Sequence, residues 1–120
     1  MQERRVGERY NISFPVRLVW KDENGNQMTE EGLTENVGPK GALVYLPRSL
    51  PQVGSSVNLV VTDQAEEVSV TAEVLRVERN ASHPLAALML TKSIKLWKEK
   101  VCDYAAQIIA DQEPEELDDW

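Results

Sequence analysis

Three arginines stand close together near the start of the chain, at Arg4, Arg5 and Arg9. The chain as a whole has a formal net charge of −7, so this cluster runs against the overall balance. A guanidinium group forms paired hydrogen bonds with two phosphate oxygens, or with the O6 and N7 atoms of guanine. The cluster therefore predicts a site for an anion.

The other reactive side chains are few and scattered. Cys102 is the single cysteine and His83 the single histidine, so the sequence offers no internal disulfide and no cysteine–histidine set for a zinc site. Cys102 falls beside the apolar stripe of a predicted helix, where packing is its expected role. His83 falls in a predicted turn without an evident catalytic partner. We therefore expect no metal, no cofactor and no enzymatic reaction.

Length and composition indicate one soluble domain. Hydrophobic residues make up 42% of the 120 residues and charged residues 28%, values that are ordinary for a globular protein. No apolar run approaches the roughly 20 residues that a membrane-spanning helix needs, and the first residues are polar rather than signal-like. We expect a cytoplasmic protein without membrane insertion.

The negative charge is concentrated at the end of the chain. Residues 111–120 contain six acidic and no basic side chains, and the rest of the chain has 13 basic and 14 acidic residues. A nearly neutral body argues against binding to a nucleic acid polymer, which relies on a broad cationic surface. It does not argue against a small anion held by a few local arginines.

The elements that must position the arginines follow from hydrophobic periodicity. Over residues 11–20 every second side chain is apolar, which predicts a half-buried strand directly after the cluster. Asn24-Gly25 predicts a hairpin turn to a second strand over residues 27–35. Residues 36–41 contain two glycines and a proline and are predicted as a turn.

Four more strands and one helix are predicted downstream. The strands cover residues 42–46, 57–62, 68–78 and 86–90. Apolar residues then recur every three or four positions from Ile94, which indicates an amphipathic helix that buries Trp97 and Tyr104. The fold class is mainly β: a six-stranded antiparallel β-barrel with a C-terminal α-helix packed on it.

The same patterns set the expected domain limits. Residues 1–110 form a single domain, and residues 1–9 are its flexible, arginine-bearing N-terminal segment. Residues 111–120 are expected to be an acidic, disordered tail.

Two motifs, taken in order, resemble those of the PilZ domain family, bacterial receptors for cyclic di-GMP. The family motif R-x-x-x-R precedes the first barrel strand, and residues 5–9 read RVGER. The second motif, [D/N]-x-S-x-x-G, leads into the third strand, and residues 36–41 read NVGPKG. The match holds at Asn36 and Gly41 and departs at Gly38, where the family has serine. The resemblance covers about residues 4–110 and implies the PilZ type of barrel.

The resemblance also implies roles for the arginines. Arg5 and Arg9 would grip cyclic di-GMP through its phosphates and guanine bases. In relatives, an extra arginine at the position of Arg4 accompanies binding of a stacked pair of ligands. Lys40 and Arg76 stand at the expected periphery of the site.

For the second motif, the resemblance implies that Asn36 reaches a guanine edge. Gly41 is expected to supply a positive φ at the turn. Gly38 lacks the serine hydroxyl, and one lost hydrogen bond of about 0.5–1.5 kcal/mol weakens affinity about threefold to tenfold. Gly38 is also expected to loosen the turn, at an ordering cost on binding.

The leading interpretation is a receptor that binds cyclic di-GMP and relays the signal to an unidentified downstream protein, in motility or biofilm formation. Residues 1–9 would fold over the barrel when the ligand binds. The alternative is a PilZ-like adaptor that binds no nucleotide and acts through protein–protein contacts in pilus or motility systems. A barrel for single-stranded nucleic acid ranks lower, because it needs exposed aromatic side chains and a basic groove.

Overall fold

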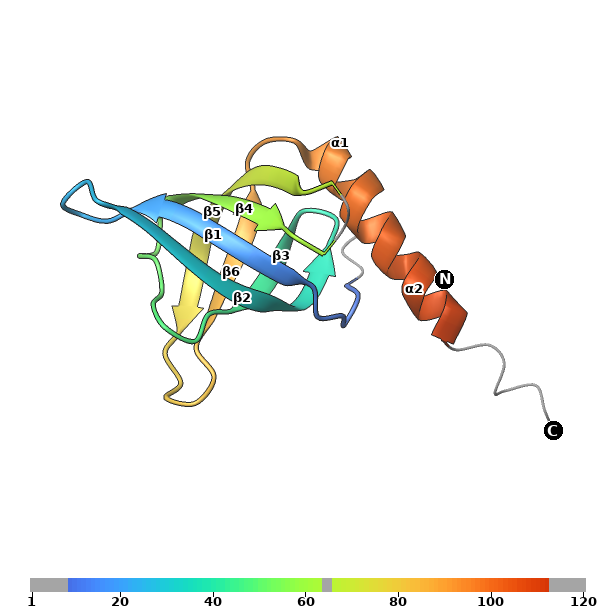
Figure 1. Ribbon diagram of the computed structural model, residues 1–120, viewed down its shortest axis with the longest axis horizontal. Coiled ribbons are helices and arrows are strands. Elements are labelled where there is room, and N and C mark those ends of the chain that lie inside the picture. Colours follow the sequence, from blue (N-terminus) through green and yellow to red (C-terminus); the bar gives the residue numbers. More distant parts are fainter. Residues whose placement is uncertain (1–8, 64–65, 113–120) are drawn as a thin grey trace.

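The computed structural model of the chain describes residues 9–63 and 66–112. Within them, six antiparallel strands close into a barrel in the order β1-β2-β3-β6-β5-β4 (Figure 1). The strands are β1 Pro15–Lys21, β2 Gln27–Gly38, β3 Gly41–Tyr45, β4 Ser56–Val61, β5 Val68–Glu78 and β6 Leu85–Leu90. The predicted fold class is confirmed. The antiparallel pairing of β1 with β4 closes the barrel.

Alternation along β1 builds one side of the barrel core. Val16, Leu18 and Trp20 are buried, and the residues between them lie toward the outside. The regular strand begins at Pro15, later than the alternation suggests. Before it, the buried hydroxyl of Thr34 accepts a hydrogen bond from the Phe14 backbone N–H at 2.8 Å and donates to the Ile12 carbonyl at 2.6 Å. The Thr34 backbone N–H also donates to the Phe14 carbonyl at 3.0 Å, so the Thr34 side chain replaces only part of the ladder there.

The predicted turn over residues 36–41 is wrong in extent. Strand β2 continues to Gly38, which pairs with Gly41 at the start of β3, and the turn consists of Pro39 and Lys40. The Leu90 backbone N–H donates to the Lys40 carbonyl at 2.8 Å. This bond ties the tight turn to β6. Because β2 continues to Gly38, Asn36 lies within a strand and not in a turn.

A C-terminal helix runs past one end of the barrel, as Figure 1 shows. It consists of α1 Ile94–Trp97, the π-helical turn η1 Lys98–Cys102 and α2 Asp103–Gln112. Trp97, Val101 and Ala105 are fully buried on its inner side. The ring of Tyr104, which remains 37% exposed, stacks on Phe14 with centroids 5.6 Å apart. Of the described helices, none is long and apolar enough to cross a membrane.

Strand β6 is unusual because it contains no polar residue. Its sequence is LAALML, and five of the six side chains are buried. A barrel strand with a solvated outer side normally alternates apolar and polar residues, whereas one covered on both sides is apolar throughout. The outer side of β6 therefore resembles that of a strand covered on both sides.

Candidate functional site

Four residues form a row across the outer side of the barrel. Asn36 in β2 pairs with Leu43 in β3, Leu43 with Ala87 in β6, and Ala87 with Arg76 in β5. Adjacent strands lie about 4.8 Å apart, so the row measures about 14 Å along the curved sheet. The row has a polar residue at each end and two apolar residues between them.

Both polar ends of the row directly follow a β-bulge. The register shifts between Thr34 and Asn36 in β2, and between Val74 and Arg76 in β5. Thr34 and Val37 are both fully buried, so the two residues between them share the outer side of the sheet. The bulge therefore keeps both Glu35 and Asn36 on that side, where regular alternation after Glu35 would turn Asn36 inward.

The second bulge repeats this arrangement in β5. Val74 is buried and Val77 packs partly against the core, so Leu75 and Arg76 both lie on the outer side. Leu75 is 49% exposed as a result. The bulge places an apolar and a cationic side chain next to each other at the end of the row.

A cavity of about 350 Å³ lies over this row. Leu43, Leu75 and Ala87 contribute apolar surface to its lining, and Arg9, Asn36 and Arg76 contribute polar groups. An apolar floor with a few convergent polar groups is the usual form of a small-molecule site. Two guanidinium groups in one lining favour an anionic ligand.

Arg9 and Asn36 are in direct contact. The Arg9 Nε–H donates to Asn36 Oδ1 at 2.7 Å. Next to this bond, the backbones of Tyr10 and Val37 exchange hydrogen bonds of 2.7 and 3.0 Å. The guanidinium has five N–H donors and the contact uses one of them. The bond thus orients a donor fork beside the Asn36 amide.

Gly38 lies in a different environment from the one predicted. It is buried at the end of β2, and its carbonyl accepts hydrogen bonds from Trp97 Nε1 at 2.7 Å and from Cys102 Sγ at 3.1 Å. The expected loosening of a turn by Gly38 is therefore wrong, because two helix side chains and the pairing with Gly41 hold this backbone.

Cys102 has the packing role that the sequence predicts. It is 4% exposed. Burial, together with the neighbouring carboxylate of Asp103, raises the pKa of its thiol from 9.0 to about 11. The thiol is therefore neutral near pH 7 and serves as a hydrogen-bond donor to Gly38.

Gly41 is required for a reason other than the predicted positive φ. The positive-φ glycines among the described residues are Gly25 and Gly54. At Gly41, a Cβ atom would lie 2.0 Å from the Leu88 backbone oxygen. Strands β3 and β6 approach each other so closely that a side chain does not fit at Gly41.

His83 has partners that the sequence did not reveal. Its Nε2 lies 2.7 Å from Glu35 Oε2, and its ring stacks on Tyr45 with centroids 4.5 Å apart. Glu35 is the extra residue of the β2 bulge, so His83 helps to hold the bulge that orients Asn36. The two residues are 48 positions apart, and no local pattern links them.

The structure brings together part of the predicted site. Arg9, Asn36 and Arg76 line one cavity, and Lys40 lies outside its lining. Arg4 and Arg5 fall outside the described residues. Leu43, Leu75 and Ala87 were missed as site residues. The available signal was the apolar sequence of β3 and β6, GALVY and LAALML, which lacks the polar residues expected on a solvated outer side. In the described ranges, no group of three or more His, Cys, Asp or Glu side chains is placed to hold a metal ion.

Fold and cavity together define a small β-barrel domain with an outer-surface site suited to an anionic ligand. A sequence model of the PilZ domain matches residues 3–92. The chain belongs to the PilZ domain family, as the resemblance predicted.

Solved structures show the same fold at low sequence identity. The PilZ domain of YcgR from Escherichia coli, solved with c-di-GMP, has a TM-score of 0.67 at 14% identity; the match covers 92% of this chain and 99% of that one. The PilZ domain of CeSA from a cellulose-synthesizing bacterium has a TM-score of 0.61 at 18% identity, with 85% and 98% covered.

A longer protein also contains this fold. The inhibitor of motility MotI/DgrA of Bacillus subtilis has a TM-score of 0.69 at 17% identity, and the match covers 93% of this chain. The chain spans 54% of that protein's length. A search of curated proteins gives no significant match.

Proposed function

We propose that this chain is a bacterial receptor for cyclic di-GMP that acts by binding and not by catalysis. The observation that carries the proposal is the Arg9–Asn36 hydrogen bond of 2.7 Å at the edge of the outer cavity. It joins a residue of each family motif in one place. Solved PilZ domains with c-di-GMP share the fold and support this ligand.

The chemistry of the cavity suits the ligand. A guanine base has a flat apolar surface, which can lie over Leu43 and Ala87, and a polar edge, which pairs with the Asn36 amide or an arginine fork. The phosphates take charge-assisted hydrogen bonds from guanidinium groups. Arg5 is proposed to bind the ligand together with Arg9, and Arg4 to allow a second ligand molecule to bind. Lys40 is proposed to lie at the periphery of the site. Gly38, which lacks the serine hydroxyl, leaves one hydrogen bond to the ligand unmade.

Signal transfer is proposed to follow from binding in the cytoplasm. Engagement of Arg5 and Arg9 holds residues 1–9 against the barrel and changes the surface that a partner protein meets. The partner itself is undetermined, and the structural similarity to the inhibitor of motility MotI/DgrA suggests a motility system.

Calorimetric titration with cyclic di-GMP tests the proposal. The wild-type chain should bind with micromolar affinity or better, and Arg9→Ala should weaken binding about tenfold to a hundredfold, because it removes hydrogen bonds to charged groups. Arg17→Ala is the matched control: it removes one guanidinium that pairs with Glu67 at 3.1 Å, away from the cavity lining. An absence of heat from the wild type at low salt and high ligand concentration contradicts the proposal.

The adaptor remains the second candidate because of two exposed apolar side chains. Leu75 and Met89, on β5 and β6, are 49% and 39% exposed. Together with Leu43 and Ala87, the two apolar residues of the row, they form a surface that a protein can cover. A wild-type chain that shows no nucleotide binding, yet loses its partner when Leu75 and Met89 are both changed to Ser, supports the adaptor.

A further inference from the structure

Arg76 occupies a position that the two family motifs do not explain. It ends the row opposite Asn36, and it lines the same cavity as Arg9. The β5 bulge at Leu75 places it on the outer side of the barrel, as the β2 bulge does for Asn36. A β-bulge therefore positions the residue at each end of the row, one bulge in β2 and one in β5, which are far apart in sequence.

The Arg76 side chain has an internal partner on the same strand. Its Nη2 lies 3.3 Å from Glu78 Oε2, two residues further along the same outer side of β5. The two side chains are 62% and 41% exposed. Such solvated ion pairs contribute little to stability, so a phosphate group can replace the Glu78 carboxylate at small cost.

We propose that Arg76 is a third ligand-binding arginine, at the end of the row opposite Asn36, and that Glu78 competes with the ligand for it. The inference rests on the proposed function. A ligand that contacts Arg9, Asn36 and Arg76 spans all four strands from β2 to β5. Glu78 holds the Arg76 guanidinium until an anion replaces its carboxylate. Glu78 thereby lowers the affinity for the ligand without contacting the ligand itself.

Two pairs of matched variants of the full chain, titrated with cyclic di-GMP, test this inference. Arg76→Ala should weaken binding tenfold or more. Arg79→Ala removes the same charge three residues away, outside the cavity lining, and should change affinity less than twofold. All variants are first checked for an unchanged urea unfolding transition.

The second pair isolates the competition. Glu78→Gln should tighten binding about twofold to fivefold, since the exposed ion pair that it removes is weak. Glu73→Gln neutralises one charge on the same strand without touching Arg76 and should have a smaller effect. In the Arg76→Ala background, Glu78→Gln should no longer tighten binding, because the group they share is gone.

The outcomes separate this inference from the proposed function. No binding by the wild type overturns both. Wild-type binding that Arg9→Ala weakens, with Arg76→Ala equal to Arg79→Ala, overturns only the role of Arg76. Equal effects of Glu78→Gln with and without Arg76 overturn the competition and leave any direct role of Arg76 standing.

Discussion

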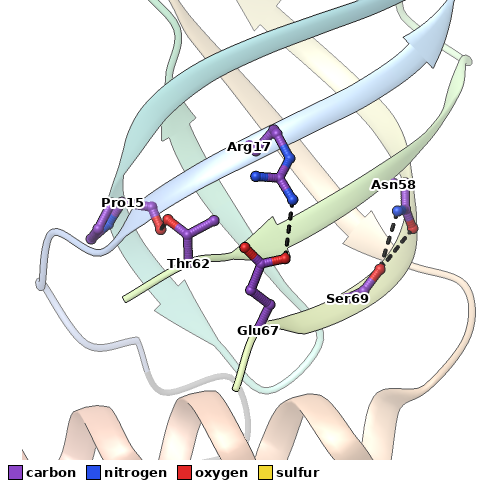
Figure 2. Close-up of polar contacts among 6 residues, drawn as sticks. All are labelled: Pro15, Arg17, Asn58, Thr62, Glu67 and Ser69. Carbon is purple, nitrogen blue, oxygen red and sulfur yellow. Dashed lines mark hydrogen bonds and ion pairs between the residues drawn. The ribbon is translucent and has the colours of Figure 1, made fainter. Parts of the chain in front are cut away.

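Two outer sides of the same barrel use their polar residues differently. On the side formed by β1, β4 and β5, polar groups pair with one another: Arg17 with Glu67 at 3.1 Å, and Asn58 with Ser69 at 3.1 and 3.2 Å (Figure 2). On the side formed by β2, β3, β6 and β5, the centre is apolar and the cations stand at the edges of a cavity. Arg9 and Arg76 also have partners on the second side, Asn36 and Glu78, so the two sides differ in the apolar centre that lies between these cations and not in whether polar groups are paired.

Size alone would not select the cavity that we propose as the ligand site, because larger depressions of about 510 and 490 Å³ lie elsewhere on the barrel. A depression of about 490 Å³ lies over β1 and β4, with Val19, Asn58 and Thr71 in its lining. Lys21 is the single cation among the described residues around it. The smaller cavity of about 350 Å³ has two arginines and an apolar floor. Chemistry, more than volume, distinguishes a site for an anionic ligand.

The largest expected effect comes from placing one carboxylate on each side. Leu43→Glu puts a negative charge into the floor of the cavity, between the guanidinium groups that are proposed to bind the anionic ligand. It should weaken cyclic di-GMP binding by about 2–4 kcal/mol. Val19→Glu makes the same change at a half-buried outer position of β1. Equal affinities of the two variants for cyclic di-GMP, measured by calorimetric titration, would contradict the distinction between the two sides.

Gly41→Ala tests the close packing beneath the side of the barrel that carries the apolar-floored cavity. The added Cβ would meet the Leu88 carbonyl oxygen at 2.0 Å, so β3 and β6 must move apart at a cost of about 1–3 kcal/mol in stability. Ser56→Ala, at the exposed start of β4, should stay within about 0.5 kcal/mol. Urea denaturation measures both, and a wild-type midpoint for Gly41→Ala would contradict the packing argument.

Restoring the family serine should have a smaller effect on the same side. Gly38→Ser supplies the missing hydroxyl and should tighten binding by about 0.5–1.5 kcal/mol. Its control is Arg9→Ala/Gly38→Ser, in which the gain should persist on a weakened background. Weaker binding by Gly38→Ser would show that the space around this buried residue does not admit the hydroxyl.

The smallest effect is confined to alkaline pH. The pKa of Cys102 is raised from 9.0 to about 11 in the folded chain, so the protonated thiol favours the folded state. This stabilisation is fully present below pH 9 and is lost as the pH rises toward 11. Relative to Cys102→Ser, which does not titrate there, the wild type should lose unfolding free energy over this interval. Parallel pH profiles would contradict the shift.

Sequence periodicity predicted the barrel because its core faces are regular. Strand β5 was predicted over the same residues that the structure shows, and the alternation through Val16, Leu18 and Trp20 located the inner side of β1. Hydrophobic burial fixes which residues lie inside, and a period of two records it directly.

The site was predicted only in part because it depends on departures from that period. The bulges at Glu35 and Leu75 interrupt the alternation, which gives no signal for two adjacent residues on the outer side. Gly38, Pro39 and Gly41 indicated a turn, so residues 36–38 of β2 were assigned to it. The partners of Gly38 and His83 come from positions 59 and 48 residues away. Such contacts arise from tertiary packing and leave no local signal in the sequence.

The two bulges also suggest how such a surface can arise or disappear. If the strand continued from Thr34 with regular alternation and no bulge, Asn36 would turn inward, toward the place of a core residue. The outer chemistry of this barrel is thus governed by single-residue insertions as much as by which residues are present. A homologue that keeps every motif residue but pairs β2 or β5 without the bulge would have the same sequence signature and a different surface.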